Sequence, residues 1–190
     1  MIISHRWQFV YLGPPKTAST TLHRWLSQPA FCESRWTPER QDQHSVTIPA
    51  ACRHYFTFAS LRDELDRTVS LWRHSQSPGE LARGWTHPMD FREFVEEFQP
   101  YASWFFRAVP AELLAPVRLD AVVRFERLER DLVNLPPLAA AIAAAVAAGR
   151  RLEPLKHLNR TRHAPWATYY TPALREQVEY RVREAGGWSL

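Results

Sequence analysis

Short apolar runs alternate with segments of helical periodicity along this chain, and this alternation constrains its fold most. Three runs have the branched and aromatic composition of buried strands: residues 7–12 (WQFVYL), 54–61 (HYFTFASL) and 120–125 (DAVVRF). A helical pattern follows each of them. Strands separated by helices predict an α/β fold of three layers, in which helices flank a central parallel sheet and ligands bind at the carboxyl ends of the strands.

The helices are expected at defined places. The first begins near Ser19, the second runs from Asp63 to His74, and Asp90 is positioned to cap a third with the sequence FREFVEEF. The segment ERLERDL then leads into an alanine-rich helix that ends at Gly149, and a last helix covers about residues 172–185.

A length of 190 residues suits one domain, which we expect to cover residues 1–190. Within it, residues 78–116 hold many aromatic side chains, and we expect a helical lid or acceptor-binding wall there. No stretch reaches the roughly 18 apolar residues of a membrane span, and the N-terminal residues lack the apolar region of a signal peptide. We therefore expect no membrane span and a cytoplasmic location. The sequence does not indicate which oligomeric state the chain adopts.

The segment GPPKTASTTL, at residues 13–22, joins the first strand to the first helix and has the properties of an anion site. The first amides of a helix have no intrahelical acceptor, and the helix dipole adds partial positive charge there. Lys16 adds an ammonium group, while hydroxyls come from Thr17, Ser19, Thr20 and Thr21. The segment is therefore expected to bind a phosphate or a sulfate. The alternative is an ordinary helix start with a capping hydroxyl.

The use of lysine in this chain singles out Lys16. Lysine occurs only at Lys16 and Lys156, although the chain contains 24 Lys and Arg together, so nearly all its positive charge is arginine. A lysine within such a background suggests that a compact ammonium is needed at that position.

The loop does not fit the Walker pattern G-x-x-x-x-G-K-[ST]. Counted from Gly13, Ala18 stands at the second glycine and Ser19 at the lysine. This mismatch argues against a P-loop nucleotide kinase.

The run Pro15-Lys16-Thr17-Ala18-Ser19-Thr20-Thr21 instead resembles the 5′-phosphosulfate loop of sulfotransferases, above all the bacterial and carbohydrate-acting members. The resemblance implies a P-loop-like sulfotransferase fold, a domain that uses 3′-phosphoadenosine 5′-phosphosulfate (PAPS) as donor, and no metal. It implies that these residues bind the donor and that Lys16 is catalytic.

A second resemblance lies at the next strand end. The family's 3′-phosphate motif has an arginine and a serine eight positions apart, as have Arg62 and Ser70 in the segment RDELDRTVS. Glu64 stands where the family usually has proline. Arginine presents a planar fork of donors that suits a phosphate. The alternative interpretation is that both residues lie on the surface beside a helix.

His44, in the segment Gln43-His44-Ser45, resembles a short histidine-containing segment of the same family and is our candidate general base. The unperturbed pKa of histidine, near 6.5, suits it to accept the acceptor's proton. A solvated loop histidine is the alternative. His54 is a second candidate, but it precedes a strand that runs toward the site, which places it at the wrong end.

Two looser resemblances complete the sequence analysis. Residues 122–128 (VVRFERL) are similar to a strand-helix segment of the family, and residues 158–161 (LNRT) are similar to its C-terminal cofactor loop. Lys156, Arg160 and Arg162 are therefore candidates for closing over the 3′-phosphate. Equally, they are compatible with a solvent-facing basic loop.

The expected acceptor is a hydroxyl or amine of a carbohydrate or small molecule. The formal charge of +4 favours an anionic ligand, but the arginines do not form one stripe, so we expect no nucleic-acid partner. Besides a kinase, a non-catalytic anion-binding or nucleotide-binding module stays an open alternative.

Overall fold

The computed structural model describes residues 1–33, 48–84, 87–97, 118–156, 158 and 163–184. Contacts divide the chain into two compact units, each described by itself. The sheet unit comprises Met1–Arg62 and Pro116–Asn159, and the helical unit comprises Asp63–Ala115 and Arg160–Leu190. The fold class is α/β, as the sequence predicts.

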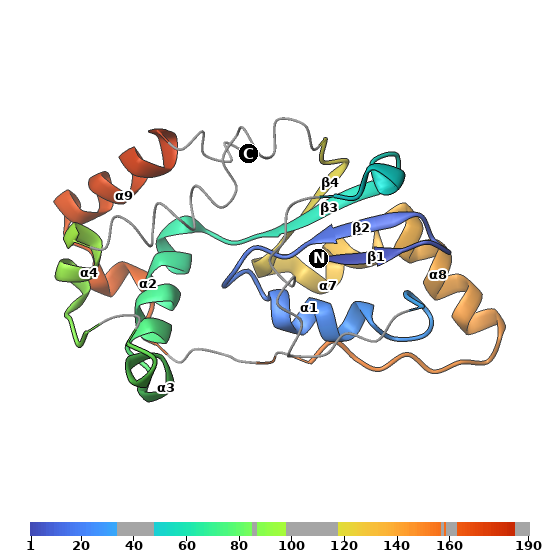
Figure 1. Cartoon of the computed structure of the whole chain (residues 1–190), viewed down its shortest axis with the longest axis horizontal. Coiled ribbons are helices and arrows are strands. Elements are labelled where there is room, and N and C mark those ends of the chain that lie inside the picture. Colours follow the sequence, from blue (N-terminus) through green and yellow to red (C-terminus); the bar gives the residue numbers. More distant parts are fainter. Residues whose placement is uncertain (34–47, 85–86, 98–117, 157, 159–162, 185–190) are drawn as a thin grey trace. The chain divides into compact units, whose positions relative to one another are not determined.

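The sheet unit is built on four neighbouring strands in the order β1-β2-β3-β4 (Figure 1). The strands are β1 (Ile2–Ser4), β2 (Phe9–Leu12), β3 (Phe56–Leu61) and β4 (Ala121–Arg124). Strands β2, β3 and β4 are parallel and confirm the three strands predicted from apolar runs. The sheet is mixed, not parallel throughout, because β1 pairs with β2 in the antiparallel direction. Three residues are too few to show a periodic pattern, so β1 was missed.

The helical elements of the sheet unit follow the predicted order, except that η2 was not predicted. They are α1 (Ser19–Leu26), η2 (Ala50–Cys52), η3 (Phe125–Arg127), α7 (Leu128–Val133) and α8 (Pro136–Ala147). Leu22 and Leu26 of α1 pack in one core with the strand residues Tyr11 and Phe58 and with Leu138 of α8. Gly149 ends the alanine-rich helix with φ +65°, as expected for a left-handed C-terminal residue.

The helical unit contains α2 (Glu64–Ser75), α3 (Pro78–Ala82), α4 (Phe91–Glu97), η4 (Trp166–Tyr169) and α9 (Pro172–Glu184). The cap predicted at Asp90 is confirmed, since Asp90 accepts a hydrogen bond from the Glu93 amide (2.8 Å). Asp63, expected as the first residue of its helix, is the N-cap of α2 and accepts a hydrogen bond from the Asp66 amide (3.0 Å). Its core joins apolar residues of α2, α4 and α9 to an edge-to-face cluster of aromatic rings. The cluster comprises Trp72, Phe91, Trp166, Tyr169 and Tyr170.

Among the described residues no single helix is long and apolar enough to cross a membrane. One pair of helices bent by 61°, Phe125–Val133 with Pro136–Ala147, meets the requirement by combined length and composition only.

Candidate functional site

The loop between β2 and α1 has a backbone suited to an anion. Lys16 (φ 64°) and Ala18 (φ 68°) both adopt the left-handed conformation, on either side of Thr17. Ala18 is the N-cap of α1, and in the described part of the chain no side chain caps this helix. Alternating left-handed residues turn successive amides toward one concave face, and the first amides of a helix lack intrahelical acceptors. The two features together favour a loop whose backbone N–H groups bind an anion.

A buried chain of hydrogen bonds supports this loop from below. The Thr17 hydroxyl donates to the Pro14 carbonyl (2.6 Å), so its only proton is committed and it accepts from Ser60 (2.7 Å). The Ser60 proton is then committed too, and Ser60 accepts from the Tyr11 hydroxyl (2.8 Å). Burial raises the pKa of Tyr11 above its ordinary value, which agrees with a neutral donor. Thr17 therefore faces the sheet, and its hydroxyl fixes the loop.

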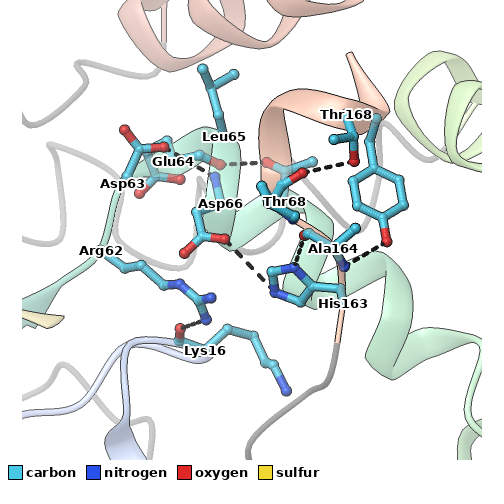
Figure 2. Close-up of polar contacts among 12 residues, drawn as sticks. Lys16, Arg62, Asp63, Glu64, Leu65, Asp66, Thr68, His163, Ala164 and Thr168 are labelled. Atoms are coloured by element: carbon cyan, nitrogen blue, oxygen red, sulfur yellow. Dashed lines mark hydrogen bonds and ion pairs between the residues drawn. The ribbon is translucent and has the colours of Figure 1, made fainter. Parts of the chain in front are cut away.

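Arg62 joins the loop to the ends of two further strands. Its Nη1 donates to the Lys16 carbonyl (3.3 Å), a contact drawn in Figure 2, and its guanidinium lies 4.3 Å from the centre of the Phe125 ring. Arg62 follows β3 and Phe125 follows β4. The carboxyl ends of all three parallel strands thus converge on the Lys16 loop, as the sequence predicts for a ligand site in an α/β fold.

His23 was not predicted from the sequence, yet it determines the space around Gly13. Its ring is fully buried and its Nδ1 donates to the Ser19 carbonyl (2.7 Å), one helical turn earlier. A Cβ at Gly13 would lie 2.7 Å from the His23 ring and 3.1 Å from the Tyr11 ring. The glycine after the strand was the only sequence signal of this close approach.

The remaining hydroxyls of the loop differ in their surroundings. The Thr21 hydroxyl accepts a hydrogen bond from the Leu158 amide (2.9 Å) and so holds a distant segment against α1. Ser19 is buried, whereas Thr20 is half-buried. Within the described part of the chain, the Thr20 hydroxyl makes no hydrogen bond, which makes it the loop hydroxyl best placed to bind a ligand.

The segment that carries Lys156 is anchored on α1 at two points. At one end the Trp25 indole donates to the Glu153 carbonyl (3.0 Å), and the Gln28 side chain accepts from the Glu153 amide (2.8 Å). At the other end Leu158 is held by Thr21. The exposed Lys156 side chain lies between these anchors. The structure therefore places Lys156 in an irregular segment that is held against the helix following the Lys16 loop.

In the helical unit, two carboxylates in the first turn of α2 lie close to basic side chains. Glu64 accepts from Arg67, whose side chain is only 5% exposed, at 2.7 Å. Asp66 lies 3.7 Å from the His163 Nε2, a contact also drawn in Figure 2. Ser70 is 1% exposed on the buried side of α2. The carboxylate of Glu64, which replaces the proline of the family motif, is thus held in an ion pair.

Three predicted residues, His44, Arg160 and Arg162, lie outside the described residues, as does much of the predicted lid. His54 is exposed at the amino end of β3, and because β2 and β3 are parallel, this is the end opposite to the Lys16 loop. The predicted position of His54, at the start of its strand, is therefore confirmed. The core of the helical unit contains the aromatic side chains of Trp166, Tyr169 and Tyr170. The Tyr170 hydroxyl donates a hydrogen bond to the Leu65 carbonyl (3.0 Å).

Comparison with protein-family models finds no match, and comparisons with curated proteins and with solved structures find no significant match. No group of three or more His, Cys, Asp or Glu among the described residues is arranged to hold a metal ion.

Proposed function

We propose that this chain is a sulfotransferase that takes the sulfuryl group from PAPS and passes it to a hydroxyl or amine of a carbohydrate or small molecule. The observation that carries the proposal is the loop between β2 and α1. Its Lys16 and Ala18 adopt positive φ, and no side chain among the described residues caps its helix start. Its sequence also has the donor-loop pattern. Fold and motif thus favour an anion at the same place.

The donor carries negative charge at two separate positions, and the chain offers basic groups for both. The loop amides, the Lys16 ammonium and the Thr20 hydroxyl suit the 5′-phosphosulfate. Arg62, held beside the loop, suits the 3′-phosphate, with Ser70 as its predicted partner. We propose a P-loop-like sulfotransferase fold on the same grounds, supported by the order of β2, loop, α1 and the later parallel strands.

Sulfuryl transfer forms a bond from sulfur to the acceptor oxygen or nitrogen and breaks the bond from sulfur to the phosphate oxygen. The electron pair of the broken bond stays on that oxygen, and the acceptor proton passes to a base. In our proposal Lys16 and the loop amides stabilise the charge on the leaving oxygen, as donors do in phosphoryl transfer. His44 is the proposed base.

The proposal is tested by following transfer of radiolabelled sulfate from PAPS to a panel comprising a phenol, a monosaccharide and an amino sugar. We expect product with the wild-type chain and a loss of at least 100-fold with Lys16→Ala, with unchanged thermal unfolding. Lys16→Arg keeps the charge but not the compact ammonium, and is expected to lose at least 10-fold. Full activity of Lys16→Ala would refute the assignment. Phosphate transfer from ATP would favour the kinase alternative.

A further inference from the structure

Phe125 and Arg62 are brought together by the register of two parallel strands. Leu61, the last residue of β3, pairs with Arg124, the last residue of β4. Arg62 and Phe125 are the next residue of each strand, so they leave the sheet side by side. The half-buried Phe125 ring lies 4.3 Å below the Arg62 guanidinium. The contact therefore follows from the sheet itself.

The ring contact restrains the guanidinium, whose carbon lies over the Phe125 ring. An aromatic face attracts an arginine cation, and an arginine held against a ring has less freedom to turn its N–H donors away. One of them, on Nη1, meets the Lys16 carbonyl at 3.3 Å. The Arg62 guanidinium is thus restrained by the Phe125 ring on one side and by the Lys16 carbonyl at Nη1.

We propose that Phe125 is a positioning residue for recognition of the donor's 3′-phosphate, acting through Arg62. This inference rests on the proposed function. Phe125 supplies no donor of its own, and its role is to keep the fork in one orientation before the ligand arrives. A preoriented fork loses less conformational freedom on binding, which favours affinity.

The inference predicts a loss confined to ligands that carry a 3′-phosphate. Calorimetric titration compares 3′-phosphoadenosine 5′-phosphate with AMP, which lacks only the 3′-phosphate, on the wild-type chain and on Phe125→Leu. We expect Phe125→Leu to weaken binding of the bisphosphate about 10-fold, which is about 1.4 kcal/mol and within the range of a partly desolvated cation–π contact. AMP affinity is expected to change less than 2-fold.

Matched variants separate positioning from folding. Phe125→Met keeps an apolar side chain of similar bulk without an aromatic face, and is expected to show the same selective loss if Phe125→Leu folds poorly. Phe125→Trp keeps an aromatic face and is expected to retain the preference for the bisphosphate. In an Arg62→Ala background, Phe125→Leu should have almost no further effect on bisphosphate affinity.

The possible failures are distinguishable. A wild-type chain that binds the bisphosphate no better than AMP refutes the proposed function, and the inference falls with it. A wild-type preference for the bisphosphate that Phe125→Leu and Phe125→Met both preserve overturns the inference alone. Equal losses for both nucleotides also overturn it, because they would assign Phe125 a purely structural role.

Discussion

Replacing Thr17 by valine is expected to destabilise the chain although the two side chains have nearly the same shape. Thr17 is 1% exposed, and its hydroxyl is the middle of the chain from Tyr11 through Ser60 to the Pro14 carbonyl. Valine removes both hydrogen bonds of that hydroxyl. The Pro14 carbonyl loses its donor and the Ser60 hydroxyl loses its acceptor.

The size of the effect follows from these two lost bonds. Leaving a buried donor or acceptor without a partner costs about 1–3 kcal/mol. The buried Ser60 hydroxyl, with a smaller share from the half-buried Pro14 carbonyl, predicts a total of about 2–4 kcal/mol. For a chain of this length, such a loss lowers the midpoint of thermal unfolding by about 5–15 °C. The loop should also lose its fixed positive-φ geometry, so anion binding is expected to weaken in parallel.

Thr20→Val is the matched control, because it makes the same chemical change three residues away. Among the described residues the Thr20 hydroxyl makes no hydrogen bond, so its removal is expected to change stability by less than about 0.5 kcal/mol. Urea and thermal unfolding followed by circular dichroism measure both variants, and Thr17→Ser, which retains the hydroxyl, should recover most of the loss. Equal midpoints for Thr17→Val and Thr20→Val would refute the supporting role of Thr17.

Further predictions concern backbone strain, an ion pair and a buried phenol. Ala18→Gly relieves a positive φ and is expected to stabilise the folded chain by up to about 1 kcal/mol. At Gly149 an added Cβ meets no atom within 4 Å, but the φ is positive, so Gly149→Ala is expected to destabilise the chain by about 1 kcal/mol. Urea unfolding that shows the opposite signs would contradict the φ argument. Glu64→Pro introduces the proline of the sulfotransferase motif at the first position of α2, but it removes the ion-pair partner of the buried Arg67. We expect the free energy of unfolding, measured in urea, to fall by about 1–3 kcal/mol. The fall should be smaller for Glu64→Gln. The pKa of Tyr11 is raised in the folded state, so its contribution to stability is complete below pH 10, its ordinary pKa, and is lost as the pH rises above that value. The midpoint of thermal unfolding should therefore decline less between about pH 9 and 11 in Tyr11→Phe than in the wild-type chain. An unchanged decline would contradict this.

The strands and caps could be predicted because each is determined by neighbouring residues. Apolar runs gave β2, β3 and β4, and single carboxylates at Asp63 and Asp90 gave two helix starts. The anion binding proposed for the Lys16 loop stays a prediction, and it could be made from the sequence because it depends on the amides at a helix start and on a nearby cation.

What the sequence did not predict depends on contacts between distant residues. Thr17 was interpreted as a donor to the ligand, like its neighbours, yet its partner Ser60 comes from another strand. Phe125 lies in the segment VVRFERL, but that resemblance does not indicate its contact with Arg62, which follows from strand register. His23 carries no motif, and its importance follows only from its close approach to Gly13. The Glu64 and Arg67 pair could have been recognised from its spacing of three residues on a helix, which is a common distance for ion pairs.

The central claim is that the Lys16 loop and Arg62 together bind a nucleotide with phosphates at both its 3′ and 5′ positions. Calorimetric titration of the wild-type chain with 3′-phosphoadenosine 5′-phosphate, AMP and ATP tests it directly. We predict micromolar binding of the bisphosphate, at least 10-fold weaker binding of AMP, and loss of bisphosphate binding in Lys16→Ala. Indiscriminate binding of all three nucleotides, or tighter binding of ATP that requires Mg²⁺, would contradict the claim.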